Sequence, residues 1–443
     1  MFTVHGKAHR QCDGFARRDF LRLGTLALGG LSLSDVLHAG ARTGSSSSRK
    51  ACIMIFLSGG PSHLDTYDMK PEAPAEFRGE FSSIQTRLPG FRICEHMPMQ
   101  AQIADKLAIL RGVQTIGNHT GNEFYSGFAW EQGKPDALTN QKRPALGSVA
   151  SRLRANDRAI PAYVSLQDNP SFEQAYYLGS SHEPFRTVQR ERSNPGLANM
   201  RLAEGVTRER LADRRNLNRV FDDLRRDLDA RGAMGELDAI QSRALDIIAS
   251  SQVRDAFDLS KEPDHVKARY GSRPAAFGFI PGHDFLLARR LVEAGVSVVT
   301  IAVHGWDTHE KNFETLRDQL PTIDRALHAL ITDLEVRGML DDVTIIMGGE
   351  MGRTPRITPG RAGREHWPTT GITVMAGGGL RVGQVVGASD SRGEQPNCRP
   401  ITPAMMLSTI YHAMQIDPAQ TFLSTTGRPM HVLDERQPIR ELI

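Results

Sequence analysis

The hydrophobic positions of this chain follow two patterns, short apolar runs and helical spacing. The apolar runs are typical of strands, and the first has no polar alternation, as expected for a strand covered on both faces. They span residues 52–57, 107–113, 296–303 and 343–347. Between Asp318 and Glu335, leucine and isoleucine recur every three or four residues, which predicts an amphipathic helix. This helix joins the last two runs in a βαβ unit, so their strands should be parallel and end at one sheet edge.

The middle of the chain, about 165–290, has a different pattern. Two charged amphipathic stretches, Arg208 to Arg231 and Glu236 to Phe257, are separated by a glycine-containing break. Their charge indicates a solvated face and not a binding patch. We interpret them as a helical insertion. The predicted fold class is therefore α/β, with a mostly parallel central sheet between helices.

Composition excludes several classes of protein. The chain has 443 residues, of which 40% are hydrophobic, and its net charge is only +3, which gives no indication of nucleic-acid or membrane-surface binding. Four cysteines, Cys12, Cys52, Cys94 and Cys398, lack Cys-x-x-Cys spacing, so neither a disulfide framework nor a thiolate zinc site is indicated. Past the amino-terminal segment described next, we expect one large domain over residues 51–443.

The amino terminus resembles a twin-arginine export signal. Arg17 and Arg18 precede an apolar, glycine-rich run at 23–37 and then small residues at 39–41. A first core helix is the alternative, but adjacent glycines at 29 and 30 disfavour it. We expect a signal over residues 1–39 and a flexible linker over 40–50. The mature protein would then lie in the periplasm or cell envelope, with no transmembrane segment.

The loop after the 296–303 run contains the main candidate site. Asp307 lies between His304 and His309, and ligands bind at the carboxyl ends of strands in open α/β sheets. Imidazole and carboxylate groups at this position indicate a metal or oxyanion site. A turn with hydrogen-bonded histidines is the alternative.

Two further loops carry the same residue types. His63 and Asp65 follow the 52–57 run, where Asp65 could instead cap a helix. Glu350 and Arg353 follow the 343–347 run, with His366 soon after. If a helix begins at Gly352, Glu350 and Arg353 share one side, and the guanidinium suits a phosphate or sulfate group. A surface Glu350–Arg353 ion pair is the alternative.

A fourth polar loop follows the 107–113 run. It contains His119 and Thr120, which are both candidate catalytic residues, with the Thr120 hydroxyl as the candidate nucleophile. A plain polar turn explains the same residues.

Several motifs in order resemble the exported bacterial family called domain of unknown function 1501, which is similar in fold to alkaline phosphatases and sulfatases. The motifs are Ser58-Gly59-Gly60-Pro61-Ser62-His63-Leu64-Asp65-Thr66, His304-Gly305-Trp306-Asp307-Thr308-His309, Glu350-x-Gly352-Arg353-Thr354-Pro355 and Gly363-Arg364-Glu365-His366-Trp367. The resemblance implies that Asp307, His309 and His366 hold one metal ion. Glu350 stands where the Asp-His pair of a second metal begins, but Met351 replaces that histidine.

The resemblance also implies the function. We expect an exported, metal-dependent hydrolase of phosphate or sulfate esters, acting on a small-molecule or polysaccharide ester. One or two divalent ions would polarise the ester, Arg353 would hold its non-bridging oxygens, and Thr120 or water would attack. Zinc, manganese and iron all suit nitrogen and oxygen ligands. The alternatives are an exported binding or envelope-associated protein with a degenerate site, or a metal that only supports folding.

Overall fold

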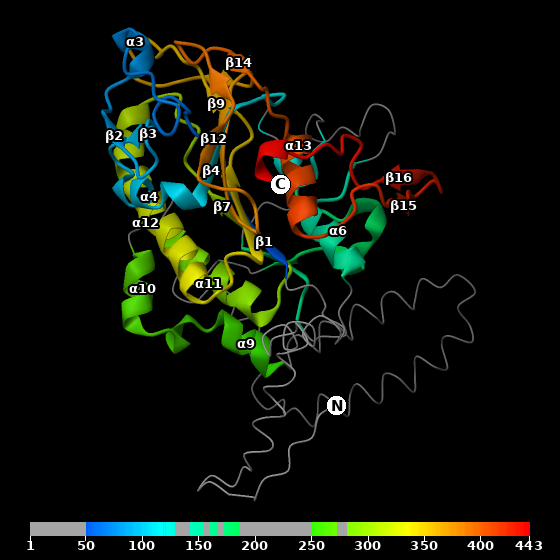
Figure 1. The fold of residues 1–443 in the computed structure, drawn as a ribbon. Coiled ribbons are helices and arrows are strands. Elements are labelled where there is room, and N and C mark those ends of the chain that lie inside the picture. Colours follow the sequence, from blue (N-terminus) through cyan, green and yellow to red (C-terminus); the bar gives the residue numbers. More distant parts are fainter. Residues whose placement is uncertain are drawn as a thin grey trace, which may run out of the picture. The chain divides into compact units, whose positions relative to one another are not determined.

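The computed structural model describes residues 50–117, 119, 121–128, 142–154, 160–166, 172–186, 250–272 and 281–443 (Figure 1). The predicted export signal, Thr120 and most of the predicted helical insertion lie outside these residues. Residues 50–443 form one compact unit, and it alone is described below.

An eight-stranded sheet forms the centre of this unit, in the order β12-β4-β11-β8-β1-β7-β5-β6. Its strands are β1 (Ala51–Leu57), β4 (Leu107–Val113), β5 (Tyr163–Ser165), β6 (Phe185–Arg186), β7 (Val298–Val303), β8 (Val343–Gly348), β11 (Gly371–Gly377) and β12 (Gln384–Val386). Only β11 pairs antiparallel, with β4 and β8, while the other five pairings are parallel. The predicted α/β class with a mostly parallel sheet is confirmed.

Alternate side chains of β1 pack into two separate cores, because successive residues of a strand point to opposite faces. Ile53 and Ile55 join the core formed with α11 (Pro281–Ala294) and α12 (Asn312–Val336). Met54 and Phe56 join the other core, formed with α6 (Leu146–Leu153) and α13 (Pro403–Ala413). Figure 1 shows α11 and α12 on one side of the sheet and α6 and α13 on the other.

Shorter elements surround these layers. The other α-helices of the described residues are α3 (Ala75–Arg78), α4 (Pro98–Gln102), α5 (Asn122–Ser126), α9 (Ser251–Phe257) and α10 (Asp264–Tyr270). Four two-stranded sheets pair β2 (Ser83–Gln85) with β3 (Arg92–Cys94), β9 (Gly352–Arg353) with β10 (His366–Trp367), β13 (Ala388–Ser389) with β14 (Pro396–Cys398), and β15 (Thr421–Leu423) with β16 (Pro429–His431).

The predicted βαβ unit is present as β7, α12 and β8. Its two strands are parallel, as expected, but β1 lies between them and pairs with both. Leu57 is level with Val303, and Phe56 is level with Gly348, so three strands end together. The loops that follow β1, β7 and β8 therefore start side by side at one sheet edge.

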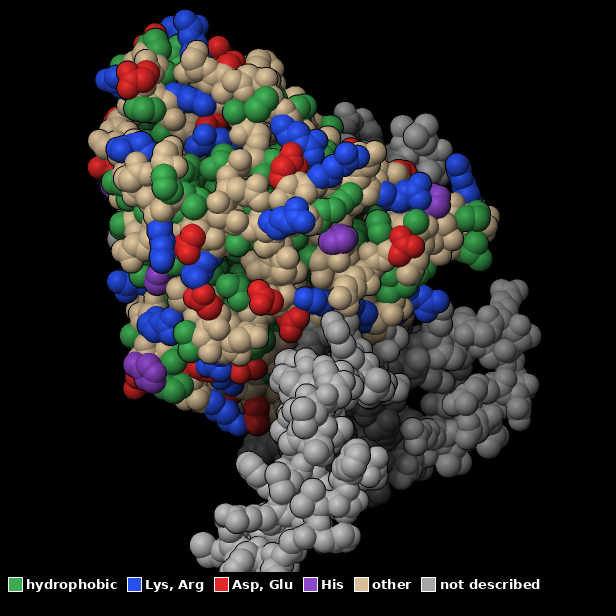
Figure 2. Space-filling model, viewed as in Figure 1, with side chains coloured by type: hydrophobic (Ala, Val, Ile, Leu, Met, Phe, Trp, Pro, Cys, Tyr) green, Lys and Arg blue, Asp and Glu red, His purple; other side chains and the backbone are tan. Residues whose placement is uncertain are grey.

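The surface agrees with the small net charge of the chain. On the face shown in Figure 2, basic and acidic side chains are interspersed. Among the described residues, no helix has both the length and the apolar character needed to span a membrane.

Candidate metal centre

Glycines in the first loop allow the three loops to pack closely. Gly59 and Gly60 have φ angles of +112° and +83°, which disfavour residues with a side chain. A Cβ atom on Gly59 would lie 2.3 Å from the backbone nitrogen of Asp307, and one on Gly60 would lie 2.4 Å from the carbonyl oxygen of Met351. The loop after β1 thus lies directly against the loops after β7 and β8.

The segment that leads into β10 runs beside the loop after β7. The backbone N–H of Arg364 donates to the carbonyl of Thr308 at 3.0 Å, and that of Asn312 donates to the carbonyl of Ala362 at 2.9 Å. Between these bonds, a Cβ atom on Gly363 would lie only 1.8 Å from the carbonyl oxygen of His309. This contact brings His309 and His366 to the same place.

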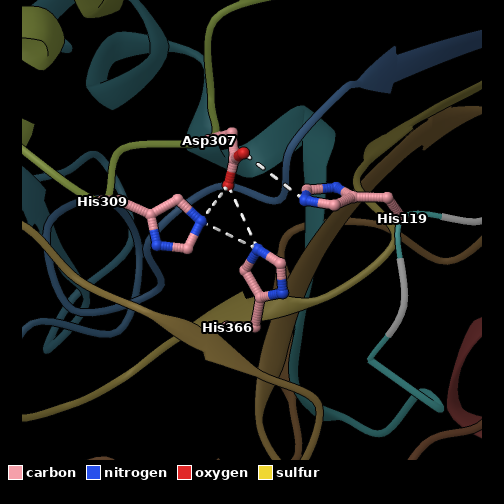
Figure 3. Close-up of side chains that lie close together, drawn as sticks. All are labelled: His119, Asp307, His309 and His366. Carbon is pink, nitrogen blue, oxygen red and sulfur yellow. Dashed lines mark hydrogen bonds and ion pairs between the residues drawn. The ribbon is translucent and has the colours of Figure 1, made fainter.

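Four side chains meet at this edge of the sheet (Figure 3). His119, Asp307, His309 and His366 each offer a ligand atom, and these atoms all lie within 4.8 Å of one another. Asp307 is central: its Oδ1 lies 2.9 Å from Nε2 of His309 and 3.2 Å from Nε2 of His366, and its Oδ2 lies 3.4 Å from Nε2 of His119. The fold therefore brings together the loops after β4 and β7 and the strand β10 around one point.

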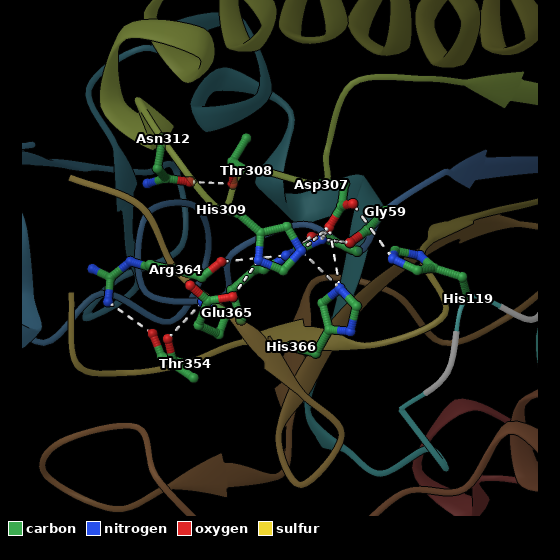
Figure 4. A network of polar contacts seen from close by, with 12 residues as sticks. Gly59, His119, Asp307, Thr308, His309, Asn312, Thr354, Arg364, Glu365 and His366 are labelled. Atoms are coloured by element: carbon green, nitrogen blue, oxygen red, sulfur yellow. Dashed lines mark hydrogen bonds and ion pairs between the residues drawn. The ribbon is translucent and has the colours of Figure 1, made fainter. Parts of the chain in front are cut away.

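Two carboxylates contact the Nδ1 atoms of two of the histidines and so orient the rings, as Figure 4 shows for Glu365. Glu365 contacts Nδ1 of His309, and Glu350 lies 3.2 Å from Nδ1 of His119. An ionised carboxylate can only accept, so each Nδ1 must donate its hydrogen. In the neutral imidazole, the lone pair on Nε2 then faces the centre of the cluster, which is the arrangement of metal-bound histidines.

These lone pairs need a cation or a proton between them. Nε2 of His309 lies 3.0 Å from Nε2 of His366 and 2.9 Å from a carboxylate oxygen. Ligand atoms bound at 2.0–2.1 Å around a tetrahedral zinc ion are about 3.3 Å apart. The three Asp307–imidazole separations of 2.9–3.4 Å are close to this value, and all four ligand atoms lie within 4.8 Å of one another, so the group could hold one ion; three imidazoles and one carboxylate suit zinc, manganese or iron.

The electrostatics of the cluster favour ligand binding at Asp307 and His366. Partial burial acts to raise the pKa of Asp307, but the hydrogen bond and charge of Arg353 outweigh it and lower that pKa. Partial burial and the positive charge of Arg353 lower the pKa of His366. The hydrogen bond to Glu350 raises the pKa of His119, so a proton competes more strongly with a cation for this ring.

Arg353 lies in a different setting from the one expected. Residues 352–353 form the short strand β9 and not the start of a helix, so the helical spacing to Glu350 does not apply and that prediction is wrong. The Arg353 side chain is fully buried. Its Nε donates to the carbonyl of Gly60 at 3.1 Å, its Nη1 to that of Arg364 at 3.3 Å, and its Nη2 to that of Gly59 and to Asp307. All three nitrogens thus contact protein oxygens, and the guanidinium holds Asp307.

Asp65 and His63 lie outside the ligand cluster, although both are in the predicted loop. The fully buried Asp65 carboxylate accepts from the Arg364 guanidinium at 2.7 and 3.0 Å and from the Asn312 amide at 2.9 Å. Nε2 of His63 contacts the carbonyl of Gly393 at 2.8 Å. The structure gives Asp65 a supporting position, because its ion pair fixes the residue that precedes Glu365 and His366.

Glu350 is also outside the group of four. Its two carboxylate oxygens accept from the backbone N–H of Gly59 at 2.8 and 3.1 Å, and one of them contacts His119. The neighbouring Met351 is buried. Within the described part of the chain, the cluster of four is the one group with three or more potential metal ligands. The geometry therefore fits one ion in this part of the chain, with Glu350 beside it.

Sequence reasoning missed two features of this site. It proposed His119 for a catalytic role, whereas its Nε2 lies with the three predicted ligands. It gave no role to Glu365, although an acidic residue directly before a candidate ligand histidine was an available signal. The predicted nucleophile Thr120 lies outside the described residues.

Comparisons with known proteins find similar solved structures and one family model. A search of curated protein sequences finds no match. Solved structures that resemble the chain include the sulfatase PsFucS1 from Pseudoalteromonas sp., at 10% identity over 92% of this chain and 73% of that chain, with a TM-score of 0.38. They also include the phosphonate monoester hydrolase SpPMH from Silicibacter pomeroyi, at 11% identity over 84% and 74%, with a TM-score of 0.36. A third is Ps i-CgsB in complex with k-i-k-neocarrahexaose, at 10% identity over 83% and 72%, with a TM-score of 0.41.

Similarities of this size leave the function to be inferred from the site itself. By sequence, the family model described as "Protein of unknown function (DUF1501)" matches residues 49–443. The chain belongs to the DUF1501 family.

Proposed function

We propose that this protein binds one divalent transition-metal ion and hydrolyses phosphate or sulfate esters with it. The observation that carries the proposal is the convergence of three imidazole nitrogens on the Asp307 carboxylate, two of them oriented by Glu350 and Glu365. Such a donor set holds zinc, manganese or iron. A bound ion supplies Lewis acidity, which polarises a phosphoryl or sulfuryl oxygen.

Solvent access supports a catalytic and not a purely structural ion. The side chains of Asp307 and His119 are 42% and 47% exposed, and that of His366 is 30% exposed. Catalytic zinc sites keep one coordination position for water or substrate, so an ion held by all four side chains would need a coordination number above four to bind an ester. The cluster also lies at the carboxyl ends of parallel strands, where α/β sheets bind ligands.

The protein's own groups have separate tasks in this proposal. Arg353 fixes Asp307, while Glu350 and Glu365 fix the rings of His119 and His309. We keep Thr120 as the proposed nucleophile, because it directly follows His119 in the sequence. The substrate is a small-molecule or polysaccharide ester, and the site of action is the periplasm or cell envelope.

The test combines metal analysis with an ester screen. We expect about one bound ion per chain by elemental analysis, and hydrolysis that is lost on chelation and restored by the ion. His309→Ala and His366→Ala should lose both properties. His265→Ala, an exposed histidine on α10, is the matched control and should keep both. Unchanged metal content in both His309→Ala and His366→Ala contradicts the proposal.

A second function is favoured by one observation. Met351 is buried at the position where the resemblance expects a second metal ligand, so the site is simpler than a two-metal hydrolase. An exported protein could then bind esters without cleaving them. Metal-dependent binding with no turnover of any phosphate or sulfate ester would establish this alternative.

A further inference from the structure

The charges around the ligand cluster restrict what it binds. Three carboxylates and one guanidinium contact the cluster or belong to it: Asp307, Glu350, Glu365 and Arg353. The charge of the nearby Arg364 is balanced by the buried Asp65. These side chains carry an excess of two negative charges, which one divalent ion just neutralises. Counted over these described side chains, the loaded site has no surplus positive charge to attract a doubly charged anion.

The two guanidinium groups at the site bond to oxygens of the protein. Every nitrogen of Arg353 contacts a backbone carbonyl or Asp307. Arg364 likewise bonds to Asp65 and to the carbonyls of Thr354, Pro355 and Phe77. A bidentate fork is the usual protein device for a dianionic phosphate. Among the described residues that contact the cluster, both guanidinium groups thus bond to protein oxygens.

We infer that this site selects esters that carry a single negative charge: sulfate monoesters, or phosphate diesters and phosphonate monoesters. Phosphate monoesters are dianions above their second pKa, which is about 6, and bring a second charge that the site does not compensate. This inference rests on the proposed ester-hydrolase function. It differs from that function in stating which charge class is bound.

Three esters of the same phenol test the inference. Phenyl sulfate and methyl phenyl phosphate are monoanions with different central atoms, and phenyl phosphate is a dianion at pH 8. Calorimetry on metal-loaded protein at pH 8 should give at least tenfold weaker binding for phenyl phosphate than for the better monoanion. That factor corresponds to about 1.4 kcal/mol. Initial rates of phenol release at equal concentrations should follow the same order.

A charge variant and a matched control separate electrostatics from fit. Glu365→Gln removes one negative charge beside the cluster, while its amide oxygen still accepts from His309. At saturating metal concentration, it should improve phenyl phosphate binding relative to phenyl sulfate about threefold or more. Asp264→Asn makes the same charge change on α10, where the side chain is 97% exposed, and should leave the ratio unchanged.

The outcomes distinguish the two claims. Phenyl phosphate binding as tightly as the monoanions, or an unchanged ratio in Glu365→Gln, overturns the charge inference while ester hydrolysis stands. If none of the three esters binds, the ester-hydrolase proposal fails and the inference fails with it. Preference for both monoanions over phenyl phosphate supports the inference, whichever central atom is cleaved.

Discussion

Glu365 determines which nitrogen of His309 carries the hydrogen. Because an ionised carboxylate accepts only, its contact with Nδ1 leaves Nε2 to the metal. The hydrogen bond to His309 lowers the pKa of Glu365, so the carboxylate is ionised at neutral pH. We expect Glu365→Ala to weaken metal binding about 10- to 100-fold, as loss of such an orienting partner typically does. Competition with a fluorescent chelator measures the dissociation constant.

Glu365→Gln and Glu310→Ala are the controls for this prediction. Gln retains an oxygen that accepts from Nδ1, so its loss of affinity should be smaller than that of Ala. Glu310 is in the same loop, but it is exposed and its ion pair with Arg361 is long, at 3.9 Å. Loss of its side chain should therefore leave metal affinity unchanged. Equal weakening by Glu310→Ala would assign the effect to general loop charge and not to His309.

Gly363 determines how closely β10 approaches the loop after β7. A Cβ atom there would overlap the carbonyl group of His309, at 1.8 Å from its oxygen and 2.1 Å from its carbon. Both atoms are backbone and cannot rotate away, so Gly363→Ala must separate the two segments. We expect metal affinity to fall at least tenfold, because ligand positions within about 0.5 Å matter in such sites. Isothermal titration of the metal-free protein measures it.

Gly360→Ala is the matched control on the same segment. Gly360 has a φ of +77°, so alanine costs roughly 1 kcal/mol of stability in the left-handed region, but its Cβ would meet no atom within 4 Å. Its metal affinity should therefore equal that of the wild type. Similar affinities in both variants would mean that the Gly363 contact does not position the ligands.

The apolar runs predicted where the strands lie in the sequence better than they predicted which strands pair. The runs at 52–57, 107–113 and 343–347 became β1, β4 and β8 almost residue for residue, because strands buried on both faces need continuous apolar sequence. Periodicity does not encode which strands pair, so the position of β1 between β7 and β8 could not be read. Nor could it separate Asp307 from Asp65, because a ligand carboxylate and an ion-paired one are the same residue type.

Glu123, in the first turn of α5, makes the stability of the protein depend on pH. The residue is only 7% exposed, and its carboxylate accepts from the backbone N–H of Ile116 at 2.8 Å. Burial raises its pKa from 4.5 to about 7. The folded state then holds this proton more tightly than the unfolded chain. The stabilising contribution is fully present below about pH 4.5 and is lost as the pH rises through about 7.

Glu123→Gln removes this dependence, because a neutral amide keeps an acceptor for Ile116. Relative to the wild type, the variant should gain stability between pH 5 and pH 8, by up to about 3 kcal/mol. Urea unfolding at the two pH values measures the difference, and the comparison cancels the other groups that titrate there. An equal pH dependence in both proteins would show that Glu123 is ionised throughout.

The proposed export signal lies outside the described residues. We propose that Arg17 and Arg18 direct export, because they precede an apolar run that ends in small residues. Replacing both with lysine keeps the charge and removes the paired guanidinium groups, so uncleaved precursor should accumulate in the cytoplasm. Cell fractionation with an antibody to the mature chain measures this. An unchanged periplasmic yield would refute the proposal.

Metal binding should stabilise residues 50–443 as one unit, because its ligands are far apart in the sequence. His119 follows β4, Asp307 and His309 follow β7, and His366 begins β10. The unfolded chain does not hold these four side chains together, so an ion binds almost only to the folded state. At a free metal concentration 100 times the dissociation constant, binding adds about 2.7 kcal/mol to the free energy of unfolding.

Chelation should remove this stabilisation in the wild type and have no effect on the free energy of unfolding of His309→Ala. Hydrogen exchange should locate the change, with faster exchange after chelation at the N–H groups of Arg364 and Asn312, which join the two ligand segments. Equal unfolding curves with and without the ion, in protein shown by elemental analysis to contain it, would place the ion somewhere other than this cluster.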